Sequence, residues 1–591
     1  MSIVKHLQKA VTEALNNCFE RTFNEADFQI NQTKPEFEGD YTIVLFALIK
    51  FLKKSPEEIG NTIGDYLIKH QPEFFSKYNI IKGFLNISVD DQYWISFLQK
   101  NYNDSCFGSH AMNGKKVMVE YSSPNTNKPL HLGHLRNNFL GWSVAEILKA
   151  NGFEVLKSCI VNDRGIHICK SMIAWQLFAN GATPSSTNQK GDHFVGDYYV
   201  KFNDEYKKQI SELMATGMNE GEAEKKAPIM LQTQQMLQDW EAGNSDVISL
   251  WKEMNSWVYE GFDITYKKIG SDFDKTYYES ETYLLGKDII QEGIDKNVFI
   301  RKEDGSVWID LTSDGLDEKL VLRKDGTSVY ITQDIGLAKQ KYDQFGIDQS
   351  IYVIGDEQNY HMKVLKLIAQ KLGLPYANDI YHLSYGMVEL PSGKMKSREG
   401  TVVDADDLVE EMIATSKHHT EALGKVKEFS EAELLQLYNT IGLGAMKFYL
   451  LRVDPKKKMI FNPEESIDFH GFTGPFVQYT YARIKSILRK ENIFSVEKYE
   501  LPLLKLEKDV LYNLEQYPQI IQDAGKELNP SIIANYIFHL AKTFNSFYSE
   551  HSISNAENEE KKSLRLYLSN MTAMVLRNGL KLLGINVSEK M

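Results

Sequence analysis

The spacing of apolar residues changes along the chain and separates regions of different predicted structure. The first hundred or so residues combine amphipathic helical patterns, beginning with MSIVKHLQKAVTEALNN, with a short strand signal, GFLNISV, at 83–89. A polar run, NYNDSC, follows. We therefore predict a small α+β domain over residues 1–110.

The next region begins with a strand, a turn and a helix. KKVMVEYSS at 115–123 has a strand pattern and leads, through a turn rich in Pro and Asn, into a helical pattern from about His134 to Ala150. A second strand signal, FEVLKSCIV, follows. Such a β-turn-α-β unit predicts a parallel sheet that binds its ligands at the carboxyl ends of its strands.

The remaining pattern predicts an insertion and a helical end. From about 180 to 300 the chain is polar, with a loop at TPSSTNQKGDH, and strand signals return at SVWIDL and SIYVIGD. After about 430 the periodicity is helical almost to the end. We predict an α/β protein with a Rossmann-type parallel-sheet domain at 111–430, interrupted by an insertion at about 180–300. An all-α domain follows at 431–591.

Composition limits the class of protein. A chain of 591 residues is too long for one core, and it has no uncharged apolar stretch of about 18 residues that could span a bilayer. The N-terminus lacks the apolar segment and cleavage site of a signal peptide. The four cysteines form no CxxC pair, which indicates neither a zinc knuckle nor a disulfide framework: Cys18, Cys106, Cys159 and Cys169. We expect a cytoplasmic protein.

The net charge argues against a generally basic surface for nucleic acid, since the formal value is −13. Local cationic runs do occur, for example Lys456, Lys457 and Lys458. A solvated surface explains such a run at least as well as a row of phosphate contacts. Charge alone therefore decides nothing about a polyanionic partner.

The first candidate site is the segment VEYSSPNTNKPLHLGHLRNN at 119–138, where the predicted strand turns into a helix. The N–H groups of a helix start favour phosphate, Gly133 lets an adenine ring approach the backbone, and the imidazoles of His131 and His134 can hydrogen-bond phosphate oxygens. Two histidines on one turn are also explained as capping or packed residues. Metal binding is a further alternative, but no acidic or Cys ligand is suitably spaced, and we predict no bound metal.

A second candidate site lies far downstream, at LPSGKMKSREGTVV, residues 390–403. Gly393 and Gly400 flank a run of cations that could close over a triphosphate. Taken by itself, this segment is better explained as an exposed charged hairpin.

Together, HLGH and KMKSR resemble, in this order, the HIGH and KMSKS signatures of the class I aminoacyl-tRNA synthetases. The surrounding sequence is similar to the arginyl-tRNA synthetase family. SPNTNKPLHLGHLR resembles its extended first signature, and later blocks follow in the right order over nearly the whole chain: VNDRGIHICKSM, YITQDIGLAKQKYD, YVIGDEQNYHMKVL and TGPFVQYTYARIKSIL.

The resemblance implies an enzyme that uses ATP, with Mg²⁺ on its phosphates, to convert L-arginine to arginyl-adenylate. The arginyl group then passes to the 3′-terminal adenosine of tRNA(Arg). It also implies that the N-terminal domain contacts the outer corner of the tRNA and that the C-terminal helices bind the anticodon. We expect a monomer with tRNA, arginine and ATP as its partners.

ATP binding and catalysis are carried over by position. The resemblance assigns ATP to residues of both signatures: His131, Gly133, His134, Lys394, Met395, Lys396, Ser397 and Arg398. The second lysine of KMSKS is replaced here by Ser397, and in the family a lysine just before the first signature is thought to substitute for it. That lysine is Lys128, but Lys396, one position out of register, is a rival. The expected catalytic residues are thus Lys128, His131, His134 and Lys396.

Arginine requires a carboxylate that meets its guanidinium as a fork, with an aromatic neighbour to fix the plane. Tyr330 and Asp334 are spaced i, i+4 and share one face if the chain is helical there. A solvated Asp near a core Tyr is the alternative, but both positions match the family's guanidinium contacts. By the same resemblance four further residues surround the amino acid: Glu120, Ser123, Asn125 and Gln358. Which end of arginine Glu120 contacts stays open.

The tRNA contacts are likewise implied by the resemblance. Single-stranded bases stack on aromatic side chains beside cations, although aromatics at helical spacing are usually core residues. On the anticodon side the expected contacts are Phe476, Gln478, Tyr479, Arg483 and Met591, and at the tRNA corner Phe84 and Asn86.

Three other interpretations remain. Another class I synthetase, for glutamate or cysteine, is possible, although the zinc ligands of the cysteine enzyme are absent. A non-catalytic relative that binds RNA would typically have lost His131, His134 or Lys128, and all three are present. A small nucleotidyltransferase that shares HxGH does not fit the length or the later blocks.

Overall fold

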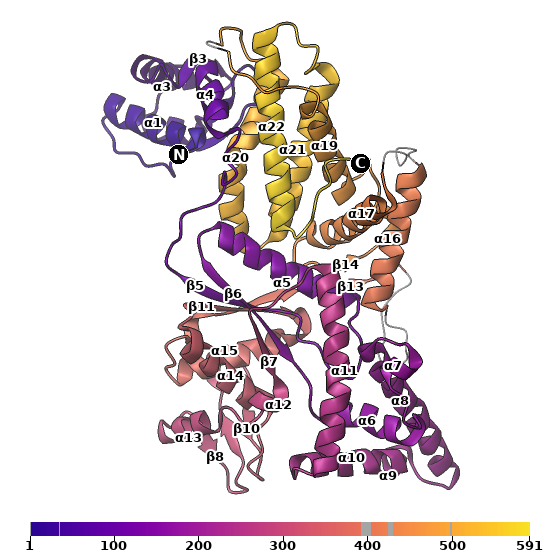
Figure 1. Cartoon of the computed structure of the whole chain (residues 1–591). Helices are drawn as coiled ribbons and strands as arrows, with labels where there is room; N and C mark the ends of the chain where they lie inside the picture. Colours follow the sequence, from indigo (N-terminus) through magenta and orange to yellow (C-terminus); the bar gives the residue numbers. More distant parts are fainter. Residues whose placement is uncertain (1, 35, 392–402, 423–428, 497–498) are drawn as a thin grey trace.

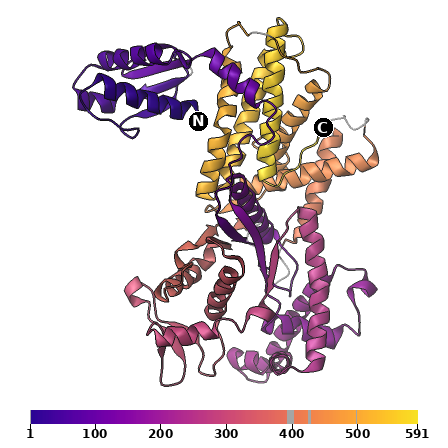
Figure 2. The ribbon, with the colours of Figure 1, turned by 60° about the vertical axis from the view of Figure 1, so that its left-hand side comes forward.

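The computed structural model describes residues 2–34, 36–391, 403–422, 429–496 and 499–591. The N-terminal part is an antiparallel sheet in the order β1-β2-β4-β3, against which helix α3 packs. Its elements are α1 (Ile3–Cys18), β1 (Gln29–Gln32), β2 (Tyr41–Val44), α2 (Phe46–Leu52), α3 (Pro56–His70), β3 (Phe75–Ile81), β4 (Phe84–Val89) and α4 (Asp91–Asn101). Helix α1 is amphipathic and buries Ile3, Leu7, Val11 and Leu15 on one face. This part stands beside the upper end of the C-terminal helices (Figures 1 and 2).

A five-stranded parallel sheet, in the order β12-β11-β5-β6-β7, forms the centre of the molecule. Its strands are β5 (Lys116–Glu120), β6 (Glu154–Val161), β7 (Lys275–Tyr278), β11 (Gln349–Gly355) and β12 (Ile380–Tyr385). Helix α5 (Leu132–Ala150) connects β5 to β6, as the strand-turn-helix pattern predicted. The order reverses at β5, which has β6 on one side and β11 on the other. Such a switch point opens a crevice for ligands at the strand ends.

Two insertions interrupt this sheet, where we expected one. The first is a block of helices that lies below the sheet in Figure 1: α6 (Ile166–Phe178), α7 (Pro184–Thr187), α8 (Gly191–Ala215), α9 (Glu220–Lys226), α10 (Pro228–Glu241) and α11 (Ser245–Ile269). Strand β7 then returns to the main sheet from within the range expected to be insertion. It was missed because it is a four-residue edge strand with only Tyr277 buried, so it has no apolar run.

The second insertion follows β7 and leads into two helices that pack against each other. Its three short strands form a separate antiparallel sheet, so the strand expected at SVWIDL exists but belongs to this small sheet. The elements are α12 (Glu279–Thr282), α13 (Lys287–Asp295), β8 (Ile300–Arg301), β9 (Val307–Ile309), β10 (Lys319–Leu322), α14 (Tyr330–Phe345) and α15 (Asn359–Lys371).

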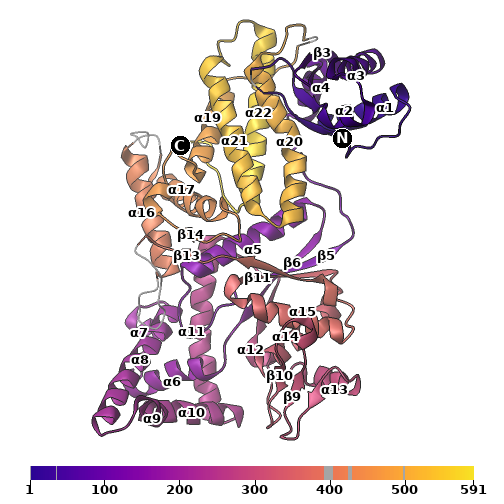
Figure 3. The same ribbon diagram turned by 180° about the vertical axis from the view of Figure 1, so that it is seen from behind.

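The C-terminal part is helical, with three long helices, α20, α21 and α22, side by side and α19 against them (Figures 1 and 3). Its helices are α16 (Ala405–Ala422), α17 (Glu431–Leu451), α18 (Pro463–Ser466), α19 (Gly474–Leu488), α20 (Lys505–Glu527), α21 (Pro530–Glu550) and α22 (Glu559–Leu582). The short strands β13 (Val388–Glu389) and β14 (Met459–Ile460) join it to the end of the sheet. The predicted fold class is therefore confirmed.

Within the described ranges, no helix combines the length and the apolar character needed to cross a lipid bilayer.

Candidate active site

The turn between β5 and α5 is held in a left-handed conformation that side chains of α5 stabilise. Ser122 and Ser123 have φ values of 78° and 47°, which L-residues rarely adopt. The N–H of Ser122 donates to Oδ1 of Asn137 at 2.5 Å, and Asn138 donates to the hydroxyl of Ser122 at 3.1 Å. These contacts hold the turn in its strained conformation, as surrounding contacts do for strained backbone at functional sites.

The two histidines of the first signature close the start of α5 with their Nδ1 atoms. Nδ1 of His131 accepts the N–H of Gly133, and Nδ1 of His134 accepts the N–H of His131, each at 3.1 Å. A neutral imidazole with Nδ1 as acceptor carries its hydrogen on Nε2. The capping role that the sequence left open therefore uses one nitrogen of each ring, and each Nε2–H remains a donor.

Burial keeps both rings uncharged near neutral pH. Burial, and then the charge of Lys128, lower the pKa of His131 to about 4 and hold that of His134 well below its ordinary value. Burial also lowers the pKa of Lys128, and no carboxylate among the described residues forms an ion pair with it. The turn thus presents two neutral N–H donors beside one half-buried cation that has no carboxylate partner among the described residues.

A cavity of about 250 Å³ lies where this turn meets the ends of β11 and β12. Asn137 spans it, donating to the carbonyl of Val353 at 2.7 Å and to the hydroxyl of Tyr385 at 3.1 Å. The described residues that line it include no carboxylate: Ser122, Ser123, His131, Gly133, His134, Asn137, Val353, Ile354, Gly355, Tyr385, Met387 and Val388. An anionic ligand such as a nucleotide suits these walls.

The predicted guanidinium contacts lie on α14, on the other side of β11. Tyr330 is the first residue of α14 and is 73 % exposed, and Asp334 follows one turn later, so the expected helical face is confirmed. Oδ2 of Asp334 lies 2.5 Å from Nε2 of His361, and this hydrogen bond raises the pKa of His361. Sequence reasoning missed His361, because local periodicity does not show a pairing across 27 residues.

Glu120 lies at the end of β5 but already has a cationic partner. Its Oε2 is 2.5 Å from Nζ of Lys341, and both side chains are buried. Burial alone would lower the pKa of Lys341, but Glu120 raises it above its ordinary value. The sequence offered no signal for this pair, whose members are 221 positions apart. Glu120 is thus engaged with a residue of the protein itself.

The other predicted arginine contacts are accessible. Ser123 lines the cavity, Asn125 is exposed and bridges to Asn162, and Gln358 is exposed in a short 3₁₀ turn before α15. The second signature residues Lys394, Met395, Lys396, Ser397 and Arg398 lie outside the described residues.

A second cavity, of about 560 Å³, opens beside Tyr330. Arg164, to which the sequence assigned no role, lies in its wall with the guanidinium carbon 3.8 Å from the ring centre of Tyr283 and a nitrogen 2.9 Å from Glu241. Burial raises the pKa of the neighbouring Glu279 to about 7. Sequence reasoning missed Glu279 and Tyr283, because both come from the short elements that follow β7.

Two of the residues predicted to contact tRNA are buried in the structure. Asn86 is 1 % exposed and hydrogen-bonds Thr42 and Asn79 within the N-terminal sheet. Gln478 is fully buried and donates to the carbonyls of Thr440 and Asn586. Both amides satisfy buried polar groups, so neither side chain can reach an RNA in this conformation.

The other predicted tRNA contacts reach the surface to different degrees. Phe84 is 36 % exposed and packs edge-on against Phe46. Arg483 donates to Asn545, and its guanidinium lies over the ring of Tyr479 at 5.0 Å. Phe476 and Met591 are half-buried.

Comparisons with known proteins identify the family. The family model described as tRNA synthetases class I (R), catalytic domain, matches residues 98–462. An arginyl tRNA synthetase N terminal domain matches 5–89, and a DALR anticodon binding domain matches 477–591. The arginine–tRNA ligase of Flavobacterium psychrophilum is 53 % identical and that of Amoebophilus asiaticus 50 % identical, each aligned over 100 % of both chains.

The chain belongs to the arginyl-tRNA synthetase family. It is an ATP-dependent enzyme that ligates arginine to tRNA, so the function expected from the chain-wide resemblance is confirmed. The fold agrees. The structure of the Thermus thermophilus arginyl-tRNA synthetase has a TM-score of 0.79 at 24 % identity, covering 99 % of this chain and 100 % of that one. The arginyl-tRNA synthetase of Plasmodium falciparum has a TM-score of 0.76 at 18 % identity, with coverages of 100 % and 99 %.

The depressed pKa of His131 predicts a pH-dependent stability. The pKa of His131 is about 4 in the folded protein and about 6.5 in the unfolded chain. Its contribution to the free energy of unfolding is therefore complete above pH 6.5 and is lost as pH falls toward 4. His131→Asn keeps a capping side chain, so the wild type should lose stability more steeply than the variant below about pH 6.5, by on the order of 1 kcal/mol per pH unit. Urea unfolding at several pH values measures this, and parallel curves would contradict it.

The Glu120–Lys341 pair predicts a specific loss and a specific rescue. Glu120→Gln leaves a buried ammonium without a counter-charge and should destabilise the protein by about 3–5 kcal/mol. Glu120→Gln combined with Lys341→Met removes both charges and should restore most of that loss. Thermal unfolding compares the two variants. A double variant as unstable as the single one would show that the pair is not the cause.

Proposed function

We propose that the two substrates of the activation step bind on opposite sides of β11. The first signature binds ATP, and α14 binds the side chain of arginine. The observation that carries this proposal is the pair of Nε2–H donors beside Lys128, at a cavity where the described lining residues include no carboxylate. Such a group favours a phosphate on which negative charge grows. Met387 and Val388 complete the lining and lead toward the second signature, whose residues 394–398 we propose as further ATP contacts.

The proposed chemistry needs no general base, because the carboxylate of arginine is ionised at neutral pH. One of its oxygens attacks the α-phosphorus of ATP, the bond to the bridging oxygen breaks, and diphosphate leaves with the electron pair. His131 and His134 donate hydrogen bonds to the phosphate oxygens, and Lys128 supplies positive charge. Mg²⁺ neutralises part of the phosphate charge when it is bound, and the carboxylate-free lining suits a metal held by the phosphates.

For arginine, we propose that Asp334 receives the guanidinium and that Tyr330 fixes its plane. Tyr330 is free to stack, and one oxygen of Asp334 is already oriented by His361. Because Lys341 neutralises Glu120, Asp334 is the better candidate for the fork, and Glu120 acts by holding Lys341 beneath Tyr352. Ser123, Asn125 and Gln358 remain proposed contacts of the ammonium and carboxylate ends.

For tRNA, we propose that residues 1–110 contact its outer corner through Phe84 and that residues 431–591 meet the anticodon side. Phe476, Tyr479, Arg483 and Met591 are the proposed contacts there. Aromatics beside a cation suit stacked bases, and the half-buried Tyr479 with Arg483 over its ring offers such a pair. Residues 111–430 carry the catalysis in this proposal. We further propose that the enzyme acts as a cytoplasmic monomer.

Asp334→Asn tests the arginine site. The loss of a charge-assisted fork should raise KM for arginine by about 10- to 100-fold and leave KM for ATP nearly unchanged. The assay is arginine-dependent ATP–pyrophosphate exchange with tRNA present. Asp343→Asn is the matched control on the same helix, where an exposed carboxylate pairs with Lys339. Equal losses for both substrates would overturn the assignment.

Lys128→Ala tests the proposed substitute for the missing signature lysine. Removal of a preorganised cation should lower the rate of adenylate formation by about 10²-fold, with little change in tRNA affinity. Single-turnover formation of arginyl-adenylate gives the rate, and filter binding gives the affinity. Lys115→Ala, exposed just before the opposite end of β5, is the control. An unchanged rate would make Lys396 the better candidate.

A further inference from the structure

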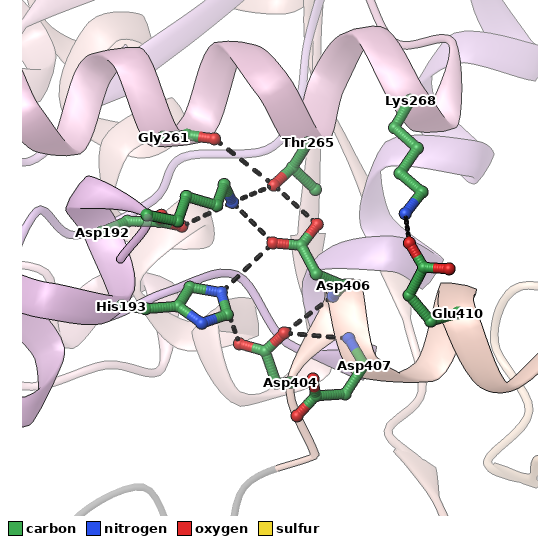
Figure 4. Close-up of polar contacts among 10 residues, drawn as sticks. Asp192, His193, Gly261, Thr265, Lys268, Asp404, Asp406, Asp407 and Glu410 are labelled. Atoms are coloured by element: carbon green, nitrogen blue, oxygen red, sulfur yellow. Dashed lines mark hydrogen bonds and ion pairs between the residues drawn. The ribbon is translucent and has the colours of Figure 1, made fainter. Parts of the chain in front are cut away.

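A cluster of charged residues joins the first insertion to the helix that follows the second signature (Figure 4). Lys190, which precedes α8, places its Nζ 2.6 Å from the hydroxyl of Thr265 on α11 and 2.6 Å from Oδ2 of Asp406 on α16. It also lies 3.0 Å from Oδ2 of the buried Asp192. The hydroxyl of Thr265 donates to the other oxygen of Asp406 at 3.0 Å. One ammonium group therefore connects three helices.

The cluster has the residue types of a metal site, but Lys190 already places a positive charge between its carboxylates. Asp192, His193 and Asp406 place ligand atoms within 4.8 Å of one another. The ammonium of Lys190 already lies between the two carboxylates. His193 adds a contact to Asp406 at 3.2 Å, and this hydrogen bond raises the pKa of His193. Burial alone would raise the pKa of Asp406, but His193 and Lys190 hold it far below its ordinary value.

The same cluster is continuous with the backbone of the first signature. Asp404 contacts His193 at 3.3 Å, and its Oδ1 accepts the N–H groups of Asp406 and Asp407, which closes the start of α16. Residues 403–405 run antiparallel to residues 130–132, with His131 opposite Asp404. Leu132 donates to the carbonyl of Val403 at 3.2 Å, and Ala405 donates to that of Leu130 at 3.0 Å. The charge cluster thus holds the short segment whose backbone pairs with that of His131.

Helix α8 also touches the first signature directly. A Cβ added to Gly196 would lie 2.8 Å from Cδ of Pro129 and 3.6 Å from Cα of Lys128. Helix α8 and the turn are therefore in close contact at Gly196, six residues after Lys190. Two independent contacts lead from α8 to the residues proposed to stabilise the phosphates.

We propose that Lys190 and His193 are positioning residues for amino-acid activation. They hold Asp406 and Asp404, and through the paired backbone they hold His131, so the inserted helices set the geometry of the first signature. This inference rests on the proposed role of His131. The sequence did not indicate this effect of Lys190 on the reaction, because Lys190 is distant from both signatures along the chain.

A second ion pair between the same two helices provides a matched control. Lys268 on α11 pairs with Glu410 on α16, one turn beyond Asp406, and the side chain of Glu410 is 65 % exposed. This pair also links α11 to α16, but it has no contact to residues 403–406 among the described interactions. An exposed pair contributes little to stability. A merely structural role would make the two pairs differ in stability alone.

The experiment measures arginine-dependent ATP–pyrophosphate exchange, with tRNA present, for Lys190→Met, Thr265→Val and Lys268→Met. Lys190→Met should lower kcat by about 10²-fold, the loss that misplacement of reacting groups by about 1 Å causes, and leave KM for arginine unchanged. Thr265→Val, which removes only the bridging hydroxyl, should give a smaller loss in the same direction. Lys268→Met should keep the wild-type kcat. Thermal unfolding of each variant accompanies the kinetics.

The outcomes separate this inference from the proposed function. If Lys190→Met is folded and keeps the wild-type kcat, or if KM for arginine rises as much as kcat falls, the inference is overturned. If Lys190→Met unfolds far below the wild type, Thr265→Val decides by the same criteria. If His131→Asn also keeps the wild-type rate, the proposed role of His131 fails. A slow His131→Asn beside a fast, folded Lys190→Met rejects the positioning role alone.

Discussion

The active site depends on two hydrogen bonds at the start of α5, in which the Nδ1 atoms of His131 and His134 accept backbone N–H groups. Any helix start leaves N–H groups that need acceptors, and this one takes them from imidazoles instead of from Ser, Thr or Asp. A carboxylate in that position would cap the helix but repel a nucleotide. An imidazole caps with one nitrogen and presents a hydrogen on the other. Helix formation and the proposed phosphate binding thus use the same two side chains.

The insertions are part of this arrangement. The sheet positions β5 and β11, but the turn between β5 and α5 is strained and relies on neighbours that come from distant parts of the chain. Tyr266 of α11 contacts the hydroxyl of Ser122, and Gly196 of α8 leaves room for Pro129. On the other side of β11, α14 supplies Asp334 and Lys341. Segments that interrupt the sheet in sequence therefore complete its binding edge in space.

Local patterns predicted those features of the site that depend on residues close in sequence. The strand-turn-helix at His131 follows from a β pattern next to a 3.6-residue pattern, and the shared face of Tyr330 and Asp334 follows from their spacing. The pairing of Glu120 with Lys341, and that of Asp334 with His361, could not be predicted, because periodicity shows which face is buried but not what it meets. For the same reason the sequence did not show that the amide of Gln478, expected by resemblance to contact tRNA, is buried.

Gly196 determines how closely α8 approaches the turn before α5. Because Gly196 has no side chain, α8 packs directly against the ring of Pro129, and the approach of the insertion to the turn before α5 leaves no room for a side chain at this position. Reacting groups must be held to within about 0.5 Å. A methyl group at this position would come too close to Pro129, so one of the two surfaces would have to shift. The position of α8 therefore limits how far the turn before α5 can move, because Gly196 places no side chain between them.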